Sequence, residues 1–303
     1  MAGNQRGDLP AARQYIDGAL PHATKAAQRM LRPTDDLYAI SLRLVATGMH
    51  FQARDYDAAR TLANEALHAA LAAPHQRHLR SVCSAHECLA LCALFMHEDS
   101  TQHIDAMVAA ARTMGLTVMV SSGPYLRGRA AINHGRYEAA CSLFVEAQAR
   151  LSAAKSRQHW ADCTLILGWT LLRLDKLGEG VTALRSALDE FDALDDPLGS
   201  AAARTLLADA RCRSGESARA METLEAEIAT LLSDVLLWDA LPRGAQRAAA
   251  WRVLQASRDP RAPLMREQAI RDIQTDAAQV RDASARARML AGAPDSVALR
   301  LEA

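Results

Sequence analysis

The sequence predicts an all-α protein, and three observations support this fold class. Alanine, the best helix former, supplies 63 of the 303 residues. Aromatic residues, which fill strands together with β-branched residues, make up only 4% of the chain. A pattern of small and apolar residues also recurs along the middle of the chain. The composition therefore argues against an all-β fold, and the repeat favours stacked helices with a large buried core.

Three segments in the middle of the chain align at a spacing of 40 residues. They are residues 125–147, 168–187 and 207–224. The small residues that match between them are Ala140, Gly180 and Ala220. An earlier copy covers residues 47–66. A fixed period of this length is typical of repeat architectures, in which each unit buries its apolar face against its neighbours.

Each unit is predicted to be a hairpin of two helices. In one second helix, apolar residues recur at three- and four-residue steps and form one stripe: Val181, Leu184, Leu188 and Phe191. The first helices carry a matched small residue at Gly128, Gly168 and Ala208. We expect these positions to lie where two helices cross closely, because a larger side chain there would overpack the contact.

Further units and caps are assigned on both sides. Cys83–Glu98 followed by Thr101–Gly115 fits one unit in poor register, and Ala245–Ala256 followed by Ala262–Val280 fits a later one. Terminal units need a polar outer face, so the weakly matching ends are expected to be caps. The predicted organisation is capping helices over 1–36, a repeat array over 37–235, and a degenerate repeat with capping helices over 236–303.

Two proline-containing sequences are predicted to separate consecutive units. They are Ser121-Ser122-Gly123-Pro124 and Asp195-Asp196-Pro197. The one β-like run, Met114–Val120, is expected to end one helix and cross to the next.

The repeat resembles the tetratricopeptide repeat (TPR) family. Its pattern of a small residue, then Gly-x-Tyr, Ala, Phe and Ala is met nearly in full at 128–147. Two features depart from the family: the period is near 40 residues instead of 34, and the family's tryptophan is replaced by Pro124, Thr164 and Arg204. The longer period is similar to repeats in the sensor regions of large bacterial transcriptional regulators and of ATPase- or cyclase-linked proteins.

The resemblance implies a right-handed superhelical solenoid of five to six TPR-like helical hairpins with capping helices. It also implies a bacterial protein-binding module. The inner face of such a superhelix is lined by the first helices, and the repeat register places seven residues there as candidate partner-binding residues: Tyr125, Arg129, Asn133, Trp169, Arg173, Asp209 and Arg213. Arginine and aromatic side chains are the usual anchors of protein interfaces. The alternative is that Trp169 packs against a neighbouring repeat and that the arginines pair with local carboxylates.

The charge and hydropathy of the chain limit the classes of binding partner and the cellular compartment that we expect. The chain carries 35 basic and 35 acidic side chains, whereas a dedicated nucleic-acid binder needs a basic surplus. No apolar run reaches the roughly 18 residues needed to cross a bilayer, so no membrane contact is expected. The start of the chain lacks a secretory core, and six cysteines are too dilute for a disulfide scaffold. We therefore expect a cytoplasmic protein with reduced thiols.

The densest group of soft metal ligands is Cys83, His86, Cys88 and Cys92. On one helix only Cys88 and Cys92 share a face, so His97 or His103 would have to complete a zinc tetrahedron. Small thiols packed in a helical core are the favoured interpretation, and whether this group binds metal stays open. The chain shows no residue order typical of nucleophilic catalysis. We therefore predict a protein that is not an enzyme and has no cofactor or metal site.

Two functional hypotheses follow. The leading one is a non-catalytic scaffold or regulatory protein that holds a peptide or helix of another protein in its concave groove. The alternative is a small-molecule-sensing module of a bacterial signalling or transcription system, with Trp169 and Tyr125 as a stacking wall. Homo-oligomerisation through a capping end is compatible with either.

Overall fold

The computed structural model describes residues 35–52, 55–72, 78–233, 241–242 and 244–292. The predicted N-terminal cap falls almost entirely outside these residues. Contacts divide the chain into two compact units, Met1–Gly123 and Pro124–Ala303. The three-part organisation expected from the sequence stays a prediction.

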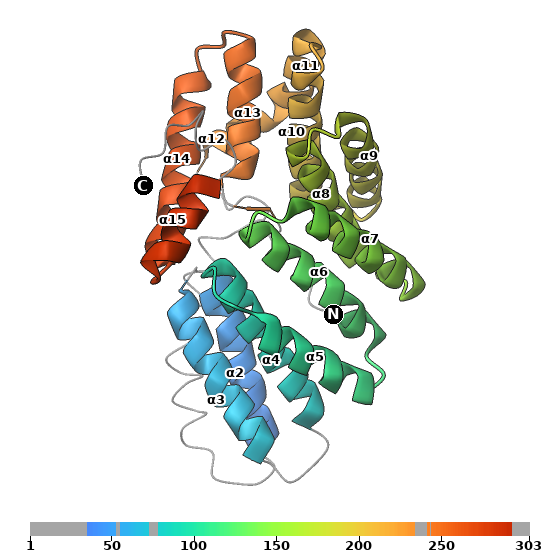
Figure 1. Ribbon diagram of the computed structural model, residues 1–303, viewed down its shortest axis with the longest axis vertical. Helices are drawn as coiled ribbons and strands as arrows, with labels where there is room; N and C mark the ends of the chain where they lie inside the picture. Colours follow the sequence, from blue (N-terminus) through green and yellow to red (C-terminus); the bar gives the residue numbers. More distant parts are fainter. Residues whose placement is uncertain (1–34, 53–54, 73–77, 234–240, 243, 293–303) are drawn as a thin grey trace. The chain divides into compact units, whose positions relative to one another are not determined.

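All regular structure in the described ranges is helical (Figure 1). The first unit contains α2 (Asp35–Gln52), α3 (Tyr56–Ala72), α4 (Leu79–Phe95) and α5 (Thr101–Thr113). Helix α6 (Thr117–Asn133) contains the boundary between the units. The second unit continues with α7 (Tyr137–Ala153), α8 (Arg157–Arg173), α9 (Leu177–Ala193), α10 (Pro197–Arg213), α11 (Ser217–Leu224), η2 (Glu225–Glu227), α12 (Ile228–Leu232), α13 (Ala245–Ala256), α14 (Ala262–Gln279) and α15 (Ala283–Gly292). None of the helices in these ranges has the length and apolar character that a bilayer crossing requires.

The 40-residue period is visible in the helix boundaries themselves. The first helices α6, α8 and α10 begin at residues 117, 157 and 197, and the second helices α7, α9 and α11 begin at residues 137, 177 and 217. In the second unit, α8 packs on α7 and α9, and α10 packs on α9, α11 and α13. The described residues form six hairpins in chain order, so the predicted all-α fold of stacked hairpins is confirmed.

The connections between these helices share one turn geometry. A residue with positive φ recurs every 20 positions, at Gly115, Gly135, Lys155, Asp175, Asp195 and Gly215. At the turn after α8, the Asp175 amide donates to the Leu172 carbonyl (3.2 Å) and the Lys176 amide donates to the Leu171 carbonyl (3.0 Å). This pattern is the Schellman motif, which satisfies the last carbonyls of a helix. The six helices that precede these residues, α5 to α10, therefore end in the same way whether or not glycine is present.

The small residues of the first helices lie at helix crossings, as predicted. A methyl group built on Gly128 would lie 2.5 Å from the Phe144 ring, and one on Gly168 would lie 2.7 Å from Cγ of Leu184. Ala208, at the equivalent position of α10, is fully buried. These separations are below any real carbon–carbon contact, so the close approach of the two helices depends on the absence of a side chain.

One predicted break is wrong. The segment Ser121–Pro124 lies inside α6 and does not separate two units. Ser121 and Ser122 are buried, and the Ser122 hydroxyl donates to the Val118 carbonyl one turn back (3.1 Å), so it is satisfied within the helix. Proline in a helix interior costs about 3 kcal/mol. We attribute the continuity of α6 to the burial of this segment, which outweighs that local penalty.

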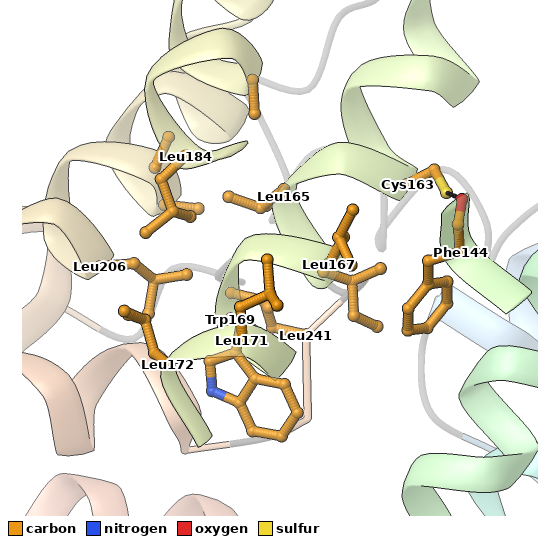
Figure 2. Close-up of a cluster of buried hydrophobic side chains, with 14 of the residues drawn as sticks. Phe144, Cys163, Leu165, Leu167, Trp169, Leu171, Leu172, Leu184, Leu206 and Leu241 are labelled. Carbon is orange, nitrogen blue, oxygen red and sulfur yellow. Dashed lines mark hydrogen bonds between the residues drawn. The ribbon is translucent and has the colours of Figure 1, made fainter. Parts of the chain in front are cut away.

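The largest core of the second unit lies where α7, α8, α9 and α10 meet (Figure 2). Phe144, Leu184 and Leu206 project into it from three of these helices and are at most 1% exposed. The Cys163 thiol donates to the Phe144 carbonyl at 3.4 Å. Leu241, which precedes α13, belongs to the same cluster. The core therefore joins the repeats to a residue that lies outside the repeat pattern.

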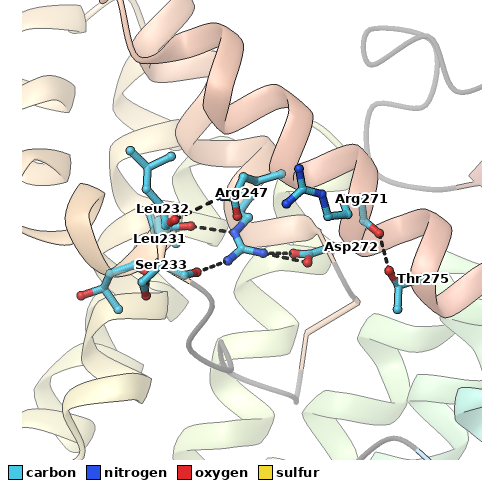
Figure 3. Close-up of polar contacts among 9 residues, drawn as sticks. Leu231, Leu232, Ser233, Arg247, Arg271, Asp272 and Thr275 are labelled. Carbon is cyan, nitrogen blue, oxygen red and sulfur yellow. Dashed lines mark hydrogen bonds and ion pairs between the residues drawn. The ribbon is translucent and has the colours of Figure 1, made fainter.

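A buried ion pair ties α12, α13 and α14 together (Figure 3). The guanidinium of Arg247 donates to both carboxylate oxygens of Asp272 at 2.7 Å. It also donates to the carbonyls of Leu231 and Ser233, each at 2.7 Å. Arg247 is 5% exposed. One side chain therefore satisfies carbonyls at the end of α12 and neutralises a buried carboxylate on α14.

Candidate partner-binding face

The seven candidate residues come from α6, α8 and α10, the first helices of three consecutive hairpins. Asn133, Arg173 and Arg213 are the last residues of α6, α8 and α10 and are spaced 40 residues apart. Arg129, Trp169 and Asp209 stand one helical turn earlier in the same three helices. Tyr125 lies one further turn back on α6. Six of the seven candidates therefore lie in the last two turns of the first helices, and basic side chains near a helix C-terminus are favoured by the helix dipole.

Arg213 joins two consecutive repeats. Its guanidinium donates to the Leu172 carbonyl at 2.8 Å and to a carboxylate oxygen of Asp175 at 2.7 Å. Leu172 belongs to the last turn of α8, and Asp175 occupies the turn after it. Because the Asp175 side chain is exposed, its ion pair with Arg213 contributes little stability, and the two contacts together orient the Arg213 guanidinium.

Arg173 rests on an aromatic ring of the preceding hairpin. Its guanidinium carbon lies 5.8 Å from the centre of the Tyr137 ring, within cation–π range. The Tyr137 ring in turn packs edge-on against Trp169, with 6.2 Å between ring centres. Trp169 is 4% exposed and belongs to the core. Trp169 therefore supports the ring beneath Arg173, while Arg173 itself is exposed.

A similar stack occurs within α6. The guanidinium carbon of Arg129 lies 5.9 Å from the centre of the Tyr125 ring. The Tyr125 ring packs against Phe144, with 6.0 Å between ring centres. Both Tyr125 and Arg129 are half-buried, as is Asn133. Two of the three arginines are therefore held over tyrosine faces.

Asp209 is buried and paired. It is 1% exposed, and its two carboxylate oxygens accept hydrogen bonds from Nε and Nη2 of Arg252, both at 2.7 Å. This bidentate arrangement joins α10 to α13. The Asp209 carboxylate is therefore used within the chain, and Arg252 is the partner that sequence reasoning missed.

Part of the expected groove is filled by the chain itself. Residues 163–172 of α8 and 205–210 of α10 are buried throughout, although a groove-lining helix would leave one face open. Leu241, Ala245 and Ala249 share a core cluster with Leu165 and Leu206 of these helices. The candidates that remain accessible stand at the helix ends. We call Arg129, Arg173 and Arg213 the arginine row.

The cysteine and histidine group of the first unit does not converge on one point. Among the described residues, no three histidine, cysteine or acidic side chains come together closely enough to hold a metal ion. Burial raises the pKa of the Cys83 thiol to about 11 and the pKa values of Cys88 and Cys92 to about 12. At neutral pH these thiols are protonated, a form that is neither a good nucleophile nor a good metal ligand.

Comparison with known proteins identifies the fold. No protein-family model matches the chain, and neither does any curated protein sequence. Among solved structures, the apo form of RapI, a TPR-like helical repeat protein, is similar over 91% of this chain and 93% of RapI. The TM-score is 0.62 and the sequence identity is 11%. At this identity the similarity concerns architecture alone, and on that basis the chain has a TPR-like helical repeat fold.

Proposed function

We propose that this chain is a non-catalytic TPR-type scaffold or regulatory protein that binds a peptide or helix of another protein. Stacked hairpins of this kind present extended surfaces that bind partners in many repeat proteins. The similarity to RapI over nearly the whole chain supports the repeat architecture on which this proposal depends.

The observation that carries the proposal is the arginine row. It places one arginine from each of three consecutive hairpins at the same end of the first helices. The planar guanidinium is less strongly hydrated than an ammonium and recognises carboxylates and carbonyls through paired hydrogen bonds. Stacking on Tyr125 and Tyr137 restricts two of these side chains before a partner arrives, which lowers the entropy lost on binding. A peptide that crosses the three helix ends would meet one arginine per repeat.

The remaining candidates have supporting roles in this proposal. Trp169 backs Tyr137, and the Asp209–Arg252 pair holds α13 against α10. Asn133 stands where α8 and α10 carry arginine, so it offers an amide at the first of the three positions. The bound segment would therefore carry hydrogen-bond acceptors opposite Arg173 of α8 and Arg213 of α10. The arginine row would contribute more to the binding free energy than the buried face of α8 and α10.

The test compares two sets of arginines. A partner is first identified by affinity capture with the wild-type chain, and its binding is then titrated against Arg129→Ala/Arg173→Ala/Arg213→Ala. Exposed arginines of the second helices, Arg150 and Arg185, are changed to alanine as the matched control. We expect at least tenfold weaker binding for the row variant and less than twofold for the control. Equal binding by the row variant and the wild type would exclude this face.

The small-molecule-sensing alternative receives less support from the structure. Its stacking wall is occupied, because Trp169 is buried and Tyr125 lies beneath Arg129. A thermal-shift screen of metabolites without a protein partner separates the two hypotheses. A metabolite that raises the melting temperature of the wild-type chain, together with no captured protein partner, would favour sensing over peptide binding.

A further inference from the structure

Two histidine side chains meet between α4 and α5 in the first unit. Nδ1 of His86 lies 3.2 Å from Nδ1 of His103. The ring centres are 5.4 Å apart, so the two nitrogens lie between the rings and face each other. Both residues are half-buried, and each stands on a helix of at least 13 residues. The position of each ring is therefore fixed by the packing of two regular elements.

The spacing of these nitrogens matches the geometry of a metal ion. Imidazole nitrogens bind Zn²⁺ at about 2.0–2.1 Å, and two such bonds at a tetrahedral angle place the nitrogens about 3.3–3.4 Å apart. The observed 3.2 Å is within the tolerance of such sites. Without metal the same contact is a hydrogen bond, in which one ring carries the proton at Nδ1 and the other presents a lone pair.

The hydrogen bond between the two rings can give way to a metal ion without loss of a proton. Burial lowers the pKa of His103, and burial together with the nearby His103 ring lowers the pKa of His86. The contact between the two Nδ1 atoms requires that at least one ring present a lone pair, and a neutral imidazole with a free lone pair is the form that binds metals. Insertion of an ion requires only that the shared proton move to Nε2 of the same ring, so two neutral rings release no net proton.

Cys83 is close to His86 in the sequence but does not contribute a metal ligand. It lies one turn before His86 on α4, but its thiol is directed to the Met107 carbonyl (3.4 Å) and is kept protonated by burial. The protein therefore supplies two ligands, and water would fill the remaining positions. Imidazole pairs suit Zn²⁺ and Cu²⁺ better than Mg²⁺ or Ca²⁺, which prefer oxygen.

We propose that His86 and His103 form a two-histidine site for a divalent transition-metal ion, Zn²⁺ or Cu²⁺, that bridges α4 and α5. The site is independent of the arginine row, which belongs to the second unit. A bridging ion would stabilise the packing of the two helices by mass action.

The experiment uses the full-length chain after chelator treatment and dialysis. Zn²⁺ alone is titrated by calorimetry, and one equivalent of Cu²⁺ is examined by electron paramagnetic resonance. We expect a 1:1 Zn²⁺ complex and a Cu²⁺ spectrum with hyperfine structure from two imidazole nitrogens. His86→Gln and His103→Gln should each weaken Zn²⁺ binding at least tenfold. His68→Gln, on an exposed face of α3, should leave it unchanged.

Two results of the Zn²⁺ titration would overturn the proposal. One is the absence of Zn²⁺ binding by the wild-type chain at millimolar concentration. The other is a double variant, His86→Gln/His103→Gln, that binds Zn²⁺ as the wild type does. Circular dichroism confirms that each variant is folded. If a variant unfolds, the wild-type Cu²⁺ spectrum decides alone, since a spectrum without two nitrogen ligands excludes the site.

Discussion

Replacing Gly168 by alanine adds a methyl group at the crossing of α8 and α9. That methyl carbon would lie 2.7 Å from Cγ and 2.8 Å from Cδ2 of Leu184, and 3.2 Å from the Leu184 backbone nitrogen. Ordinary contacts begin near 3.4 Å. The two helices would therefore have to separate by several tenths of an ångström, because the backbone atom cannot move away as a flexible side chain can.

The expected change is the difference of two opposing effects. Alanine in place of glycine stabilises a helix interior by about 0.5–1 kcal/mol, because it lowers the entropy of the unfolded chain. Overpacking a close contact costs about 1–3 kcal/mol. The net result is a loss of about 1 kcal/mol, which corresponds to a melting temperature lower by about 2–4 °C for a unit of this size.

Thermal unfolding followed by circular dichroism measures this change, with Gly178→Ala as the matched control. Gly178 lies in α9 of the same hairpin, and a methyl group there meets nothing within 4 Å. Gly178→Ala should therefore leave the melting temperature unchanged or raise it. In a Leu184→Ala background, the part of the Gly168→Ala penalty that comes from the Leu184 side chain should disappear, and the part that comes from its backbone nitrogen should remain. If both glycine substitutions raise the melting temperature, the crossing is not as tight as described.

Three further predictions concern the turns, the buried ion pair and the thiols. Lys155→Gly should raise the free energy of unfolding by about 1 kcal/mol, since Lys155 has a φ of +55° that glycine adopts freely. Gly135→Ala should lower the free energy of unfolding by a similar amount, and urea titrations measure both changes. Arg247→Ala should cost about 3–5 kcal/mol, because it breaks the buried pair with Asp272; a cost below 1 kcal/mol would contradict that burial. The Cys83 thiol, with a pKa of about 11, should react slowly with a disulfide reagent at pH 8 in the native protein and quickly in guanidinium. Mass spectrometry locates the labelled cysteine, and rapid labelling of Cys83 in the native protein would refute its burial.

Much of the fold could be predicted because the information is either local or repeated along the chain. The sequence predicts Ala245–Ala256 as the first helix of a late unit, and α13 has those boundaries. The tight crossings at Gly128 and Gly168 followed from the 40-residue alignment. The break at Ser121–Pro124 failed because a proline signal is also local, while the burial that outweighs it comes from other parts of the chain.

The candidate face was less predictable, for a related reason. The repeat register gives the side of a helix on which a residue stands, but it does not show what covers that side. Leu241 lies outside the repeat pattern, so the alignment could not predict that it packs in the core with residues of α8 and α10. The pairing of Asp209 with Arg252, 43 residues later, does not follow the 40-residue spacing, so the alignment could not predict it.

The uniform turns have a consequence for how the chain can change in length. Because positive-φ residues recur every 20 positions, a cut before Arg157 and another before Pro197 fall at equivalent points of the same connection. Removing the segment between them would leave a continuous chain in which α7 is followed by α10 across an unaltered bend. Duplicating that segment would preserve the spacing in the same way. Recombination within the coding sequence can therefore add or remove one complete hairpin, and the turn that joins the remaining helices stays the same.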